Sequence, residues 1–136
     1  MRTIADTNTV ISGLLWHGAP RSVLDAARTG QIALFTTAAL LAELEDVLLR
    51  EKFVQRLTQV NLTARDMVLG YAALTTIVET VSIGPVILDD PDDDEVLACA
   101  IAANAKVIVS GDSHLLDLKT YQDIRILSAG DLLALL

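Results

Sequence analysis

Acidic residues follow two short β-rich runs of this sequence, where their side chains could bind a metal ion. Asp6 comes directly after the run 2–5, and Asp112 follows a second run at 106–109. Because the carboxyl ends of parallel strands meet at one edge of a sheet, we expect the two carboxylates to lie close together. Carboxylates are costly to bury unless they are paired, protonated or bound to a cation. The pattern therefore predicts a cation site at this edge.

The run 89–94, D-D-P-D-D-D, offers further carboxylates at the start of an apolar helix. The stripe that one helical face would present to a core begins at Asp94 and continues through Leu97, Ala98, Ile101 and Ala105. We therefore expect Asp94 to lead the buried stripe, whereas Asp92 and Asp93 can be solvated or cap the helix. Taken by itself, the run is more typical of a turn followed by helix caps, with no ligand role.

A long helix predicted from Thr37 onward carries two candidate glutamates. Its apolar stripe consists of Leu40, Leu41, Leu44, Val47 and Leu48. Glu43 lies on one border of this stripe and Glu45 lies on the opposite border, so periodicity does not choose between them. On spacing alone, a solvated helix flank is the better interpretation of either residue.

The elements that must position these acids alternate along the chain. Strands are predicted at 2–5, 31–36, 76–81, 106–109 and 123–127, and a loop at 83–88. Helices are predicted at 10–16, 21–29, from 37, at 63–74 after a capping box, from 94, at 114–118 and at 128–136. This alternation predicts a single domain over 1–136, an α/β fold whose mostly parallel central sheet lies between two helical layers.

Composition limits the function classes. Hydrophobic residues make up 52% of the chain and aromatic residues only 4%, so we expect a core of Leu, Val, Ile and Ala that includes Cys99. Polar residues interrupt every long apolar stretch and the start is not a signal peptide, which predicts a cytoplasmic protein with no membrane partner. The net charge of −8 argues against a broad basic surface for nucleic acid, unless clustered acids hold cations that reverse the local field.

Four segments together resemble the PIN-domain family of metal-dependent ribonucleases. They are I-A-D-T-N at 4–8, L-L-A-E-L-E-D-V-L-L-R at 40–50, D-P-D-D-D-E-V-L-A-C-A at 90–100 and V-S-G-D-S-H-L-L at 109–116. The resemblance covers nearly the whole chain. Within that family, the chain is most similar to the small single-domain toxin components of toxin–antitoxin pairs, which are related to the VapC toxins.

The resemblance implies roles for particular residues. It selects Glu43 over Glu45, because Glu43 precedes the Leu of the family's E-L pattern, and it matches Asp94 to the third acid. The implied catalytic and metal-binding residues are Asp6, Glu43, Asp94 and Asp112. The implied supporting residues are Asn8 and Ser110, and further candidate ligands are Asp92, Asp93 and Asp117.

The same resemblance implies a reaction and partners. Carboxylate ligands without Cys or clustered His favour Mg²⁺ or Mn²⁺, and the expected reaction is hydrolysis of RNA phosphodiester bonds by water. A cognate antitoxin and a homodimer are the expected protein partners. The basic residues considered for contact with the RNA backbone are Arg21, Arg50, Lys52 and Lys119.

Two other functions remain open from the sequence. A strand ending in D-T-N-T is similar to the start of aspartate-nucleophile phosphatases, but Asn8 stands where these enzymes have a second Asp. A non-catalytic PIN-like module that binds a partner through apolar surface is the other alternative. We interpret His17 as a loop residue and His114 as a surface residue next to the predicted site.

Overall fold

A mostly parallel sheet forms the centre of the protein. The computed structural model describes residues 1–80 and 91–136, with the backbone alone at 91 and 92. Within these residues the strands are β1 (Arg2–Ala5), β2 (Ala33–Thr36), β3 (Thr76–Ile77), β4 (Val107–Val109), β5 (Thr120–Tyr121) and β6 (Ile124–Leu127). Their order is β3-β2-β1-β4-β6-β5, and every neighbouring pair is parallel except β5 with β6.

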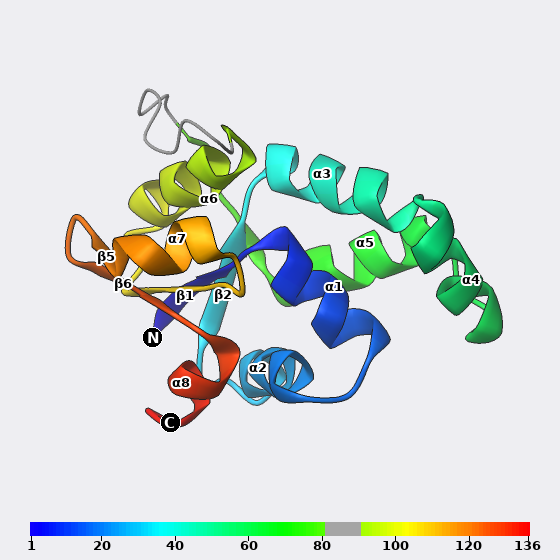
Figure 1. Ribbon diagram of the computed structural model, residues 1–136, viewed down its shortest axis with the longest axis horizontal. Coiled ribbons are helices and arrows are strands. Elements are labelled where there is room, and N and C mark those ends of the chain that lie inside the picture. The colour runs from blue at the N-terminus through cyan, green and yellow to red at the C-terminus, as the bar shows by residue number, and fades with distance from the viewer. Residues whose placement is uncertain (81–90) are drawn as a thin grey trace.

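Helices cover both faces of this sheet (Figure 1). They are α1 (Thr7–Leu15), α2 (Ala19–Arg28), α3 (Ala38–Leu48), α4 (Glu51–Gln59), α5 (Ala64–Leu74), α6 (Pro91–Ala102), α7 (Ser113–Leu118) and α8 (Ala129–Leu133). One core packs α1, α2, α3, α5 and α8 against the sheet, and a second core packs α6 and α7 against the opposite face. The predicted three-layer α/β/α fold is confirmed.

The central strands contribute to both cores. In β1, Ile4 belongs to the α6 side and Ala5 to the α1 side, and in β4 Ile108 and Val109 divide in the same way. Successive side chains of a strand point to opposite faces, so a central parallel strand buries apolar residues on both faces. The first polar side chain after each of these strands then lies at the sheet edge.

The order of the strands opens a crevice between β1 and β4. From β1 the chain proceeds to β2 and β3 on one side, whereas β4 and β6 lie on the other side. The Asp6 amide donates to the Val109 carbonyl at 3.0 Å, so the carboxyl ends of β1 and β4 are adjacent. Ligands of open α/β sheets bind at such a point, where the chains leave neighbouring strands in opposite directions.

The long helix predicted from Thr37 onward is two helices, α3 and α4. Arg50 adopts an extended conformation (φ −66°, ψ 145°) between α3 and α4. The turn lets Phe53 contact Trp16 edge-on, with ring centroids 6.1 Å apart, and lets Arg56 donate to the Leu15 carbonyl at 3.1 Å. No Pro or Gly lies at this turn between α3 and α4. We therefore attribute the turn to these tertiary contacts and not to a local sequence signal.

Other local predictions have mixed outcomes. The capping box of α5 is present, with Thr63 and Asp66 each bonded to the other's backbone amide. Strand β5 was missed, since its hairpin to β6 turns through Gln122 and Asp123 at positive φ rather than through the usual Asn-Gly. The predicted strand 76–81 is observed at Thr76–Ile77, and the predicted loop 83–88 lies outside the described residues. Of the helices described, none has the length and apolar character needed to cross a bilayer.

Candidate active site

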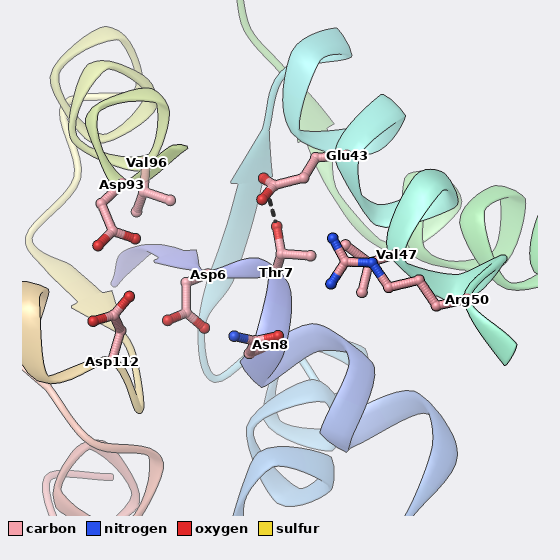
Figure 2. Close-up of a pocket in the computed structure, with 9 residues that line it drawn as sticks. All are labelled: Asp6, Thr7, Asn8, Glu43, Val47, Arg50, Asp93, Val96 and Asp112. Atoms are coloured by element: carbon pink, nitrogen blue, oxygen red, sulfur yellow. Dashed lines mark hydrogen bonds between the residues drawn. The ribbon is translucent and has the colours of Figure 1, made fainter. Parts of the chain in front are cut away.

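A cavity of about 170 Å³ lies at the carboxyl ends of β1 and β4. It is called the acidic cavity here, because its lining includes Asp6, Glu43, Asp93 and Asp112. Figure 2 shows the carboxylates of Asp6, Asp93 and Asp112 facing one another from three different segments. Asp6 and Asp93 are only 5% and 6% exposed. Buried carboxylates require a compensating charge or proton, so the donor set fits a divalent cation.

Asp6 is held from two segments, the start of α1 and the residue that follows β4. It is the N-cap of α1, where its Oδ1 accepts from the Thr9 amide at 2.8 Å. Its Oδ2 accepts from the Ser110 hydroxyl, and Ser110 Oγ in turn accepts from the Asp112 amide at 2.9 Å. A hydroxyl can donate once and accept as well, so Ser110 ties the two strand ends together. The residue predicted to support the site thus lies between Asp6 and Asp112.

Glu43 reaches the acidic cavity from α3. The Thr7 hydroxyl donates to Glu43 Oε2 at 2.9 Å, as the dashed line in Figure 2 shows. Thr7 is the first residue of α1 and follows Asp6 directly, so this bond places the two acids side by side. Glu45, the other candidate on α3, is not part of the lining.

On α6 the carboxylate in the cavity is that of Asp93. The prediction that Asp94 leads the buried stripe is wrong, because Asp93 is buried whereas Asp94 is partly exposed. Counted from Asp93, the stripe continues through Val96, Leu97, Ala100 and Ala103, all of them buried. Residues 96–100 are apolar around the whole helix, so periodicity did not identify the inward face. The side chain of Asp92 lies outside the described residues.

The chain matches the PIN-domain family over residues 2–114. It belongs to this family. A similar fold occurs in the crystal structure of VapBC2 from Rickettsia felis bound to a DNA fragment from their promoter. The TM-score is 0.62 at 17% identity, and the match covers 93% of this chain and 97% of that chain. No match was found among curated proteins.

In this PIN domain a histidine accompanies the acids. Asp112 is the N-cap of α7 and its Oδ1 accepts from the His114 amide at 2.8 Å, with His114 Nδ1 3.7 Å from the same oxygen. One atom from each of Asp93, Asp112 and His114 lies within 4.8 Å of the other two, which is close enough for a shared cation. His114 is exposed, as predicted for a surface residue next to the site. Its position two residues after a helix-capping Asp is the sequence signal for its approach to the acids.

The remaining candidates of the PIN domain divide into lining and distant residues. Asn8 and Arg50 line the acidic cavity, whereas Asp117 is exposed on α7 and is not part of the lining. Arg21 donates to the carbonyls of residues 13 and 14, so its guanidinium serves the end of α1. Lys52 lies 4.8 Å from the Phe53 ring centroid. Among the described residues that line the cavity, Arg50 is the only basic one; Lys119 is elsewhere.

Two weak acids in the core of the PIN domain stay neutral. Burial raises the pKa of Tyr71 far above its ordinary value, with smaller contributions from Cys99 and Asp6. Burial also raises the pKa of the Cys99 thiol to about 12. Among the described residues the Tyr71 hydroxyl has no hydrogen-bond partner. These groups therefore belong to the packing beneath the site and do not exchange protons at neutral pH.

Proposed function

We propose that this PIN-domain protein is a metal-dependent endoribonuclease and the toxin of a toxin–antitoxin pair. The observation that carries the proposal is the convergence of Asp6, Glu43, Asp93 and Asp112 on one cavity at the β1–β4 crevice. Four acids from four segments, two of them almost fully buried, repel one another unless a cation lies among them. Family membership supports the same conclusion.

The residues that would hold Mg²⁺ or Mn²⁺ are Asp6, Asp93 and Asp112, with Glu43 as a further ligand or as a base that orients water. When bound, such a cation supplies Lewis-acid stabilisation of the phosphate and lowers the pKa of a coordinated water. His114 adds a nitrogen donor near Asp93 and Asp112, and imidazole is a better ligand for Mn²⁺ than for Mg²⁺.

The chain's own residues orient the reactants. In hydrolysis the oxygen of water bonds to phosphorus, the bond from phosphorus to a ribose oxygen breaks, and that oxygen takes a proton. Glu43, fixed by Thr7, is placed to accept the proton that the attacking water loses. Ser110 and the Thr9 amide keep both oxygens of Asp6 in place, which reduces the reorganisation that the reaction requires.

We propose that Arg50 binds the phosphate backbone of RNA. Its guanidinium points into the acidic cavity from the α3–α4 turn (Figure 2). A planar guanidinium can bind two phosphate oxygens at once, and contacts of this kind position a strand without reading its sequence. A cation at this point also offsets part of the negative field that an overall charge of −8 presents to RNA.

Family and fold support an antitoxin partner. We propose a cognate antitoxin because the VapBC2 structure, whose fold this chain shares, is named for a pair of this kind. A homodimer and a cytoplasmic location, where RNA substrates occur, complete the proposal.

The test is an RNA cleavage assay with wild type and Asp6→Asn, with Mn²⁺ or with EDTA. We expect cleavage only with metal and a loss of at least about 100-fold in Asp6→Asn, since loss of even an outer-shell partner costs about 10–100-fold. Asn remains a good N-cap, and the lost charge relieves repulsion, so the melting temperature should be unchanged or higher. Asp117→Asn, on the exposed side of α7, is the matched control.

Unimpaired cleavage by Asp6→Asn would contradict the assignment. If wild type binds no Mn²⁺ and cuts no RNA, the non-catalytic interaction module replaces the nuclease. The phosphatase alternative lacks support among the described residues. Aspartate-nucleophile phosphatases need a second Asp and a supporting Lys, but Asn8 stands at the position of that Asp and the described lining of the acidic cavity contains no lysine.

A further inference from the structure

A second cavity lies beside the acidic one. Its volume is about 430 Å³, and it is called the neutral cavity here. Asn8 and Asp112 line both cavities, so the two share a border. We propose that the neutral cavity binds the nucleoside, base and ribose, that adjoins the scissile phosphate of the RNA. This proposal rests on the ribonuclease function proposed above and adds to it a binding site.

The chemistry of the neutral cavity suits an uncharged ligand. Its walls come from the start of α1, from 110–112 and from the start of α8, and they are built of Ser, Thr, Gly, Ala and Pro besides Asn8 and Asp112. Of the described residues that line it, only Asp112 carries a charge. The described lining offers no basic side chain for a phosphate, and Asp6 and Ser128 already cap the helix starts that could otherwise bind one. A cation would require several carboxylates. Hydroxyl and amide groups instead match the edges of a base and the hydroxyls of ribose.

The size of the neutral cavity also agrees with this ligand. Sites for small organic molecules typically measure about 300–1,000 Å³, and the neutral cavity falls in this range whereas the acidic cavity falls below it. A cation and a phosphate group are small, but a nucleoside is not. The two volumes thus correspond to two parts of one nucleotide.

The arrangement of the cavities gives the strand a path. Ser110 lines the neutral cavity and hydrogen-bonds to Asp6, which lines the acidic cavity, so this bond forms part of the partition. A phosphate above Asp6 and Asp112 would therefore place its attached nucleoside beside Ser110. Arg50 lines the acidic cavity but not the neutral cavity, and it approaches from the α3 side (Figure 2). The RNA would run from Arg50, across the acids, to the neutral cavity.

Two polar side chains of the neutral cavity, those of Asn8 and Ser12, are suited to contact the ligand. Two other hydroxyls are already engaged. Ser110 is bonded to Asp6 and to the Asp112 amide, and Ser128 accepts from the Asp131 amide at 3.1 Å as the N-cap of α8. Asn8 and Ser12 present an amide and a hydroxyl from successive turns of α1. An Asn amide both donates and accepts, as recognition of a base edge requires.

A glycine in the wall provides a steric test. A Cβ built on Gly130 meets no atom within 4 Å, and its φ is not in the left-handed region, so a larger side chain is tolerated. Gly130→Leu would occupy space beside the neutral cavity and leave all four carboxylates unchanged. Gly70→Leu on α5 is the matched control, since a Cβ there also meets nothing within 4 Å and Gly70 lines neither cavity.

The first measurement combines the protein variant with a modified substrate. Once the cut is mapped, wild type and Gly130→Leu are compared on an RNA oligonucleotide and on the same RNA without the base next to the cut. We expect Gly130→Leu and the abasic RNA each to lower kcat/KM by about tenfold, with no further loss when they are combined. Mn²⁺ binding by calorimetry should equal that of wild type. Wild-type rates in Gly130→Leu, or losses that multiply independently, would overturn the proposal.

A second measurement does not depend on catalysis. The amide NMR signals of residues 111 and 130 are followed while AMP, GMP, CMP or UMP is added with Mg²⁺. We expect shifts in wild type and Gly70→Leu that are absent in Gly130→Leu. If these shifts occur but no RNA is cut, the cavity binds nucleotides and the ribonuclease proposal fails. If RNA is cut and no nucleotide shifts these signals, the neutral cavity alone is wrongly assigned.

Discussion

The two ends of the same sheet differ in how they use charge. At the amino end a cavity of about 260 Å³ is bordered by Lys106 and Asp123, and it is larger than the acidic cavity at the carboxyl end. There Arg2 donates to the Ala103 carbonyl at 2.6 Å and lies 4.4 Å from the Phe35 ring centroid. At the carboxyl end, by contrast, buried carboxylates face one another. The size of a hollow therefore does not identify the site, whereas the convergence of buried like charges does.

The difference arises from the direction of the helices. At the carboxyl end of the sheet helices begin, and both Asp6 and Asp112 are N-caps. Free amides and the positive end of the helix dipole stabilise carboxylates at such positions. At the amino end helices finish and turns pass through positive φ at Asn104, Gln122 and Asp123. Acids can thus be concentrated at one end of the sheet without loss of the fold.

The largest expected effect distinguishes two neighbouring acids of α6. Asp93→Asn should lower Mn²⁺ affinity and RNA cleavage by at least about 100-fold, because its carboxylate faces Asp6 and Asp112. Asp94→Asn should change cleavage by far less, since Asp94 does not line the acidic cavity. Calorimetry and single-turnover cleavage measure both quantities. Equal losses in the two variants would mean that α6 presents both acids to the metal.

A smaller loss is expected when the link between the strand ends is removed. Ser110→Ala deletes the hydroxyl that bonds to Asp6 and accepts from the Asp112 amide, so both acids lose an orienting partner. Cleavage should fall by about 10–100-fold, as for other partners of metal ligands. Ser113→Ala, at the exposed first position of α7, is the control. Retention of full activity in Ser110→Ala would show that the helix caps alone orient the acids.

Arg50, the basic residue of the acidic cavity, should affect substrate binding more than chemistry. Arg50→Ala should raise KM for RNA by about tenfold and reduce the salt dependence of binding, with Mn²⁺ affinity unchanged or higher. Arg28→Ala, on the exposed end of α2, is the control for general charge. An unchanged KM in steady-state assays at two salt concentrations would exclude Arg50 from RNA binding.

The smallest effect on cleavage is expected at the amino end of the sheet. Arg2→Met removes a hydrogen bond to the Ala103 carbonyl and a contact with Phe35, so it should destabilise the protein by about 1–3 kcal/mol. Urea denaturation measures this loss. Cleavage per folded molecule should equal that of wild type. A reduced rate with unchanged stability would break the distinction between the two ends.

Part of the site was predictable because its signals are local. Asp6 and Asp112 each follow a short apolar strand, and the rule that parallel strands end at one edge was enough to bring them together. Ser110 was named from its place in the same motif. The alternation of strands and helices likewise predicted the layers, since each element must bury its own apolar face.

The sequence by itself thus determined the fold class and the strand-end acids, because both depend on short-range polarity patterns. Only the tertiary structure decided that α6 presents Asp93, since residues 96–100 are apolar around the whole helix and leave no polar face there to set its phase. Periodicity left Glu43 and Glu45 open and only the family resemblance selected Glu43, which the structure holds in the acidic cavity through Thr7 on another helix. The turn that brings Arg50 to the site depends on contacts between distant segments, which no local pattern encodes.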